Sequence, residues 1–146
     1  MSASIPLYVK RLHPDAILPK YATSGAACFD LHAIEGAVVG DGLPVTFATG
    51  LAFEVPPGYV LQVHSRSGHG FKHGVRLANA TGIIDSDYRG EVLVKLVADG
   101  GGFLHVRAGD RIAQAMLVPV PAVELIERDE LSTTERGTGG FGSTGA

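Results

Sequence analysis

Apolar residues recur along this chain in short segments that turn-forming residues separate. Several segments are rich in β-branched and aromatic residues and alternate in polarity, as strands do when one face is buried. The segment 28–34 alternates in polarity. The segment 45–55 is β-branched and aromatic, and the turn Pro56-Pro57-Gly58 separates it from a second segment at 59–65. We expect strands at 5–10, 28–34, 45–55, 59–65, 91–97 and 103–107, and two more within 112–127, broken by Pro119 and Pro121.

Helical periodicity is weak throughout the sequence. No window sustains apolar residues at the three- and four-residue spacing of a helix face, and the best candidate is a turn or so near 72–79. The run Asp99-Gly100-Gly101-Gly102 between two apolar segments indicates a hairpin. Many short strands predict an all-β protein, an antiparallel sandwich or barrel with the jelly roll among the options.

Composition limits the possible classes of protein. The 146 residues suit one domain, and 45% apolar residues can form a core. No apolar run approaches the roughly 18–20 residues of a membrane span, and Met1 does not begin a signal peptide, so we expect a soluble, cytoplasmic protein with no membrane partner. The single cysteine, Cys28, excludes an internal disulfide and a Cys-based zinc site. With a net charge of −3 and scattered basic residues, we expect no nucleic-acid partner.

The C-terminal residues differ from the rest of the chain. Residues 132–146 hold five Gly and one large apolar side chain, Phe141, so we expect a β-rich body over 1–131 and a flexible arm over 132–146. Composition alone favours a disordered tail. However, Arg136, Phe141 and Ser143 supply a cation, an aromatic ring and a hydroxyl, which could close over an anionic, aromatic ligand.

Three familiar motifs fail here. The G-x-G-x-x-G match at 137–142 has only four residues after it, too few for the helix that dinucleotide binding requires. The EF-hand-like start at Asp85 lacks the glutamate at its twelfth position. His64, His69 and His73 have spacings that suit neither a strand face nor a zinc finger.

Four other segments carry candidate chemistry. Ser65-Arg66-Ser67-Gly68 follows a strand and combines a guanidinium, hydroxyls and accessible amides, which suits phosphate binding; a polar surface turn is the alternative. Asp85 follows Gly82-Ile83-Ile84 and could be a fixed general base, or else the turn former of a β-turn. Asp30 lies between apolar residues, so it is either paired in the fold or close to a cation. Gly109-Asp-Arg-Ile-Ala-Gln114 repeats the turn-then-strand form.

Taken together and in order, these segments and the Arg136-Gly-Thr-Gly-Gly-Phe-Gly-Ser-Thr-Gly sequence resemble the trimeric dUTPase family over residues 6–145. The resemblance implies a jelly-roll homotrimer with three active sites, each assembled from all three subunits. It also implies Mg²⁺-dependent hydrolysis of dUTP to dUMP and pyrophosphate, by attack of water on the α-phosphorus. That activity keeps uracil out of DNA and supplies dUMP for thymidylate synthesis.

The resemblance also implies roles for individual residues. Asp85 would orient and deprotonate water, and Asp30 would contact the Mg²⁺ shell through water. Tyr88 would pack under the deoxyribose and leave no room for a 2′-hydroxyl. The expected phosphate cradle is Arg66, Ser67, Gly68 and Gln114, the uracil-reading hairpin is Asn79 with Gly82, Ile83 and Ile84, and the arm contacts are Arg136, Phe141, Gly142, Ser143 and Thr144.

The chain departs from the family pattern at Ser65, usually Pro, at His69, usually apolar, and at Cys28, often Gly. Two alternatives stay open. A dCTP deaminase would need a glutamate near the Arg-Ser cradle, and residues 65–75 contain none. A non-enzymatic β-rich module with a nucleotide pocket is the other.

Overall fold

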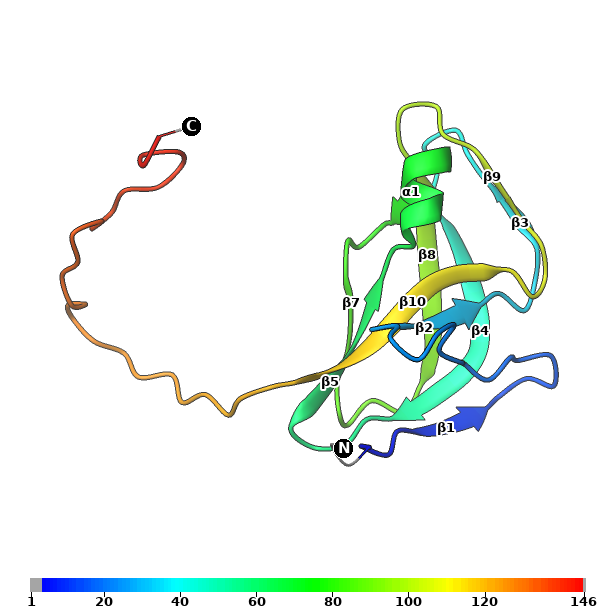
Figure 1. Ribbon diagram of the computed structural model, residues 1–146, viewed down its shortest axis with the longest axis horizontal. Helices are drawn as coiled ribbons and strands as arrows, with labels where there is room; N and C mark the ends of the chain where they lie inside the picture. Colours follow the sequence, from blue (N-terminus) through cyan, green and yellow to red (C-terminus); the bar gives the residue numbers. More distant parts are fainter. Residues whose placement is uncertain (1–3, 146) are drawn as a thin grey trace.

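The segments of alternating polarity form strands that assemble into two four-stranded antiparallel sheets in the computed structural model, which describes residues 4–145 (Figure 1). The first sheet has the order β1 (Tyr8–Arg11), β4 (Val45–Glu54), β8 (Glu91–Ala98), β6 (Val75–Leu77). The second has the order β2 (Phe29–His32), β10 (Arg111–Pro119), β5 (Tyr59–His64), β7 (Gly82–Ile84). A two-stranded sheet joins β3 (Ala37–Val39) to β9 (Leu104–Val106), and one short helix, α1, spans Ser67–His73. The predicted antiparallel all-β class is confirmed.

One hydrophobic core lies between the two large sheets. Val92, Val94 and Leu96 point inward from β8, while the alternate residues of that strand face outward. Leu31 and Leu61, from the opposite sheet, are fully buried in the same cluster. Burying each such side chain stabilises the fold by about 1.5–3 kcal/mol, so the period-two pattern determines which face of each strand is buried.

A bulge in β4 ties this strand to the beginning of β8. The pairing register shifts between Ala48 and Ala52, and Gly50 within the bulge has φ +67°. A Cβ at Gly50 would lie 2.9 Å from the Cβ atoms of Ala16 and His13, so glycine is required there. The Gly50 amide donates to Glu91 Oε1 at 2.8 Å, which anchors the first residue of β8.

Two local predictions are wrong. The helix lies at Ser67–His73 rather than near 72–79, because Gly74 adopts a left-handed conformation (φ +63°) that ends α1, and Val75 then begins β6. The second strand predicted in 112–127 does not form either: β10 ends at Pro119, the Val120 amide still donates to the Gly58 carbonyl at 2.8 Å, and the residues from Pro121 to Gly145 form no strand. Prolines at 119 and 121 lack the amide donors that a ladder would need there.

The chain beyond β10 runs away from the sandwich and does not return to it (Figure 1). Val123, Leu125, Ile126 and Leu131 are all largely exposed along this segment. None of the helices in the part of the chain that the structure describes is both long and apolar enough to span a membrane.

Candidate active site

The predicted phosphate cradle lies where β5 passes into α1. Ser65, at this junction, is held from both sides: its Oγ accepts from the Leu77 amide at 2.9 Å, and its carbonyl accepts from Gln114 Nε2 at 3.0 Å. The two bonds connect β6 and β10 to the entry of the cradle. Ser65 is therefore fixed by hydrogen bonds where the family usually has proline.

Free backbone amides mark the start of α1. Arg66 is extended (φ −89°, ψ 131°), and its carbonyl accepts from the amides of His69 and Gly70, each at 3.1 Å. The amides of Ser67 and Gly68 precede the first intrahelical bonds, as at any helix start, and no atom lies within 4 Å of the position a Gly68 Cβ would take. Ser65, Arg66, Ser67 and Gln114 line a cavity of about 370 Å³ here, so the predicted cradle residues are brought together.

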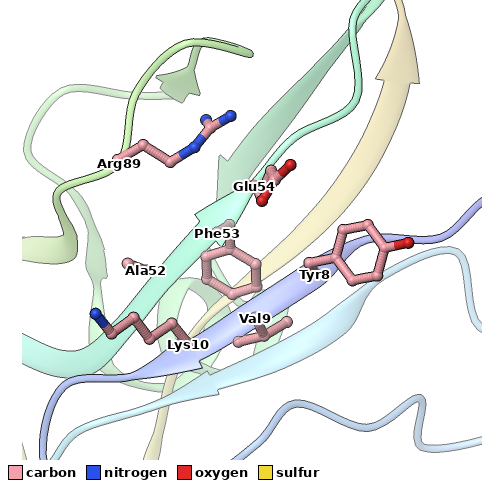
Figure 2. Close-up of a pocket in the computed structure, with 7 residues that line it drawn as sticks. All are labelled: Tyr8, Val9, Lys10, Ala52, Phe53, Glu54 and Arg89. Atoms are coloured by element: carbon pink, nitrogen blue, oxygen red, sulfur yellow. The ribbon is translucent and has the colours of Figure 1, made fainter.

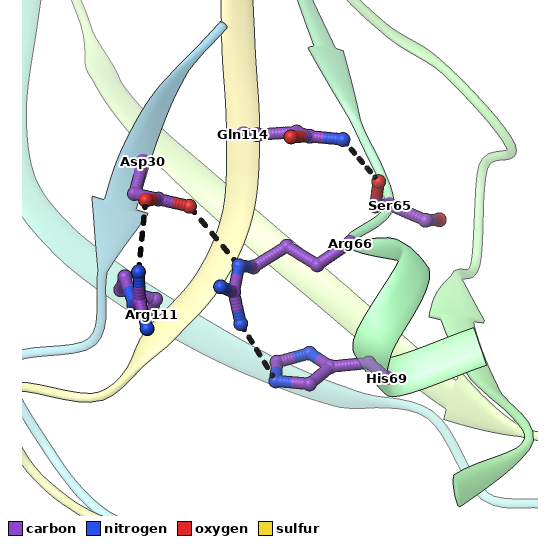
Figure 3. A network of polar contacts seen from close by, with 6 residues as sticks. All are labelled: Asp30, Ser65, Arg66, His69, Arg111 and Gln114. Carbon is purple, nitrogen blue, oxygen red and sulfur yellow. Dashed lines mark hydrogen bonds and ion pairs between the residues drawn. The ribbon is translucent and has the colours of Figure 1, made fainter. Parts of the chain in front are cut away.

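Asp30 and Arg66 form the centre of a polar network beside the cradle (Figure 3). Arg66 Nε donates to Asp30 Oδ1 at 3.0 Å, and Arg111 Nη1 lies 3.5 Å from Asp30 Oδ2. The side chains of Asp30 and Arg66 are only 16% and 23% exposed, so the pair is shielded from solvent. The prediction that Asp30 is paired or close to a cation is confirmed.

His69 extends this network. Its Nε2 lies 3.4 Å from Arg66 Nη1, and its Nδ1 is buried with no partner within residues 4–145. Burial and the neighbouring Arg66 guanidinium lower the pKa of His69 below its ordinary value of 6.5. Burial likewise lowers the pKa of His32, although the Asp30 carboxylate opposes the shift.

The predicted uracil hairpin runs antiparallel beside the same strand, starting near the cradle and leading toward the far end of β5. β7 pairs with β5, with Gly82 opposite Val63 and Ile84 opposite Leu61. A Cβ at Gly82 would lie 3.0 Å from Val63 Cβ and 3.9 Å from Asn79 Nδ2, so β7 packs closely against its neighbours. The exposed Asn79 side chain thus lies beside the hairpin.

Asp85 follows β7 and is exposed. Its carbonyl accepts from the Tyr88 amide at 3.2 Å, which closes a turn around it. Cavities of about 740 and 260 Å³ both have Asp85 in their lining, and Ile83 lines both as well. A carboxylate fixed at a strand end and open to two hollows can meet both a ligand and water.

Tyr88 lines the smaller of these two cavities, the one of about 260 Å³. Its hydroxyl donates to the Glu91 carbonyl at 3.0 Å, and a Cβ at Gly90 would collide with the Tyr88 hydroxyl. Arg89 Nη1 donates to the Ser86 carbonyl at 2.7 Å and the Tyr88 carbonyl at 3.1 Å. These bonds clamp the turn that carries Asp85.

The two groups of residues are well separated within one chain. Because Ile84 lies opposite Leu61, Asp85 lies beside Val60, and Arg66 follows six residues further along the strand. At about 3.3 Å per residue, the backbones of Asp85 and Arg66 are about 20 Å apart. Asp85 and the cradle residues of one chain therefore line different cavities.

The arm residues lie apart from both groups. Arg136 Nε donates to the Gly139 carbonyl at 2.8 Å, within the arm itself. Phe141 is fully exposed at φ +53°, and Gly142, Ser143 and Thr144 are exposed beside it. The structure gives these side chains no contact with the body of the same chain among residues 4–145.

A further cavity of about 280 Å³ lies on the outer face of β1 and β4 (Figure 2). Tyr8, Lys10, Glu54 and Arg89 surround it over a floor that includes Phe53. None of the predicted site residues lines this cavity, so it is not part of the candidate site.

Sequence reasoning gave no role to two arginines that the site uses. Arg111 reaches Asp30, and Arg89 holds the Asp85 turn. The Gly109-Asp110-Arg111 turn before β10 was the available signal for Arg111. Arg89 had none, because its partners are backbone carbonyls.

The antiparallel sandwich, the amide cradle with its arginines and the exposed carboxylate between cavities define a jelly-roll protein with the parts of a nucleotide hydrolase. The dUTPase family model matches residues 14–145. The chain belongs to the dUTPase family.

Relatives and solved structures agree with this assignment. The deoxyuridine 5′-triphosphate nucleotidohydrolase of Nautilia profundicola is 49% identical over 139 residues, which cover 95% of this chain and 98% of that protein. The enzyme of the same name from Hydrogenobaculum sp. is 48% identical, covering 95% and 97%. The dUTPase of Staphylococcus bacteriophage 80alpha, solved with dUpNHpp, has a TM-score of 0.88 and 28% identity, covering 98% of this chain and all of that one.

The donor set suits a metal that is carried mainly by a ligand. Within the described residues, no group of three or more His, Cys, Asp or Glu side chains could hold a metal ion. Asp30 offers carboxylate oxygens, but both already face arginines. Magnesium prefers oxygen ligands and retains several waters, so one carboxylate acting through water fits this ion, whereas a protein cage for it is not seen among these residues.

Proposed function

We propose that this protein hydrolyses dUTP to dUMP and pyrophosphate in the presence of Mg²⁺. The observation that carries the proposal is Asp85, an exposed carboxylate that a clamped turn holds between two cavities. The curated relatives of this chain bear the name of that activity. In the cell, the reaction would keep uracil out of DNA and supply dUMP for thymidylate synthesis, and we expect it in the cytoplasm.

The cradle would bind the phosphates. Ser67 and Gly68 offer backbone amides, Arg66 offers a guanidinium, and Gln114 retains one N–H beyond the bond to Ser65. Mg²⁺, when bound on the triphosphate next to Asp30, supplies positive charge to the phosphate oxygens. The net charge of −3 makes such local cations necessary.

The hairpin would read the base and the sugar. Backbone groups from Gly82 to Asp85, with the Asn79 amide, would pair with uracil and leave cytosine with unpaired polar groups. Packed backbone at Gly82 would exclude the thymine methyl group. The Tyr88 ring, fixed by its hydroxyl bond to Glu91, would lie under the deoxyribose and exclude a 2′-hydroxyl.

Asp85 would orient a water molecule and accept its proton as the oxygen attacks the α-phosphorus. The bond from that phosphorus to the bridging oxygen breaks, and pyrophosphate leaves. Such phosphoryl chemistry depends on positioning and charge stabilisation, so no protein nucleophile is required. The arm would then act as a lid, with Phe141 stacked on uracil and with Arg136, Gly142, Ser143 and Thr144 around the γ-phosphate.

The working unit that we propose is a homotrimer with shared sites. Two observations support it: Asp85 and Arg66 of one chain lie at opposite ends of β5, and the arm does not contact its own body. The apolar side chains of 120–131 also need cover, which a second copy of the chain would provide. We further propose that 1–131 is the catalytic body and 132–146 a flexible arm; residue 146 lies outside the described residues.

Pyrophosphate release, measured for dUTP, dCTP, dTTP and UTP with and without Mg²⁺, tests the activity. We expect turnover of dUTP alone, and only with the metal. Asp85→Asn keeps the shape of the side chain but removes the base, so turnover should disappear while dUTP still binds. Unchanged turnover in this variant would refute the assigned role of Asp85.

A further inference from the structure

Two protein groups hold the Arg66 guanidinium, one at each side. Asp30 Oδ1 accepts from Nε at 3.0 Å, and His69 Nε2 lies 3.4 Å from Nη1 (Figure 3). Nη2 and the second hydrogen of Nη1 have no partner within residues 4–145. Those hydrogens are the ones that remain for a ligand.

The chemistry of the contact determines the state of His69. A guanidinium has five N–H donors and no acceptor, so the bond forms only when His69 Nε2 presents a lone pair. The neutral ring must then carry its proton on Nδ1, the buried atom without a partner. The ring therefore keeps a buried donor unsatisfied, which costs stability, in order to accept from Arg66.

We propose that His69 is a positioning residue that sets the orientation of Arg66 toward the phosphates of the substrate. The proposal rests on the proposed function, in which Arg66 binds the triphosphate. An apolar side chain, usual at this position in the family, cannot accept from Nη1. Asp30 alone binds only Nε of the guanidinium. The guanidinium plane then stays free to rotate about the Nε–Asp30 hydrogen bond.

A positioning role predicts opposite changes in stability and in phosphate affinity. Replacing His69 by leucine removes the acceptor of Arg66 and also removes the buried, unsatisfied donor. Phosphate binding should then weaken while the melting temperature stays equal or rises. A merely structural histidine would lose both together.

The test compares His69→Leu with His69→Gln, whose side-chain oxygen can accept from Arg66. His73→Gln, at an exposed position one turn further along α1, is the matched control. Each full-length variant is titrated with inorganic tripolyphosphate and with deoxyuridine, assayed for kcat and KM with dUTP and Mg²⁺, and melted. For His69→Leu we expect tripolyphosphate affinity to fall about tenfold, KM to rise by a similar factor, and deoxyuridine binding to be unchanged. His69→Gln and His73→Gln should both remain within about twofold of the parent.

The inference is overturned if His69→Leu binds tripolyphosphate as the parent does, if His69→Gln loses as much as His69→Leu, or if melting temperature and affinity fall together. It is also overturned if the parent binds no tripolyphosphate. A parent that binds tripolyphosphate with the expected His69 dependence but does not hydrolyse dUTP contradicts the proposed function and leaves the positioning role standing.

Discussion

Two inactive variants of this protein should regain activity when their chains assemble together. Asp85→Asn removes the proposed base, and Arg66→Gln removes the proposed phosphate ligand while keeping a donor for Asp30. The two positions are about 20 Å apart along β5 of one chain. In the proposed shared site, the substrate would take Asp85 from one subunit and Arg66 from another.

The size of the recovery follows from this geometry. In a cyclic trimer assembled at random from equal amounts of the two chains, an intact Asp85 is present at half of the hairpins and an intact Arg66 at half of the cradles. About one quarter of the sites then hold both residues. If instead each chain formed its own site, none would be complete.

The assay is pyrophosphate release from dUTP and Mg²⁺ after the two chains are co-expressed in equal amounts and all trimers are purified together through one shared affinity tag. The control mixes the wild-type chain with a chain that carries both substitutions. Shared sites again leave about one quarter active, whereas sites within single chains leave about one half. Mixed single variants that stay at the residual rate of either parent would refute the shared site.

Other perturbations test the remaining parts. Deleting 132–146 should change the free energy of unfolding by less than about 0.5 kcal/mol, because the arm is exposed, yet lower turnover by orders of magnitude; full turnover would dismiss the lid. Tyr88→Ala should admit UTP, so selectivity for dUTP over UTP that does not change would count against the sugar gate. Because burial and Arg66 lower the pKa of His69 below 6.5, the unfolded chain binds the proton more readily, and stability should fall as pH drops below 6.5. Arg111 and His73 reinforce this shift and Asp110 opposes it, so His69→Gln should show a shallower loss of melting temperature as the pH drops below 6.5.

The long strands were predictable because they are rich in β-branched and aromatic residues and because a Pro-Pro-Gly turn lies between them. The segment 45–55 became Val45–Glu54, and 59–65 became Tyr59–His64. In each case a buried face and a turn of Pro or Gly limit the element. Asp30 was predictable for a related reason, since a carboxylate among apolar neighbours needs a partner.

Other features depend on distant parts of the chain. Val75 begins a strand because it pairs with Ala98 of β8, which is distant in the sequence. The local pattern alone, which predicts a helical turn near 72–79, does not contain this pairing. The segment after Pro119 is apolar enough for a strand, yet beyond the Val120 amide no strand among residues 4–145 pairs with it. The separation of Asp85 from Arg66 follows from the pairing register of β7 on β5. The spacing of these residues along the sequence does not reveal that register.

The uncovered stretch after β10 has a consequence for the newly made chain. In a chain that has not yet assembled, this segment would be an exposed, aggregation-prone strand that carries Val120, Val123, Leu125 and Ile126. The segment is interrupted by prolines at 119 and 121 and by acidic side chains at 124 and 127. Such gatekeeper residues slow non-specific β-aggregation. The same interruptions leave apolar side chains exposed for contact with a second copy of the chain, so in the proposed trimer these few residues would favour correct assembly over aggregation.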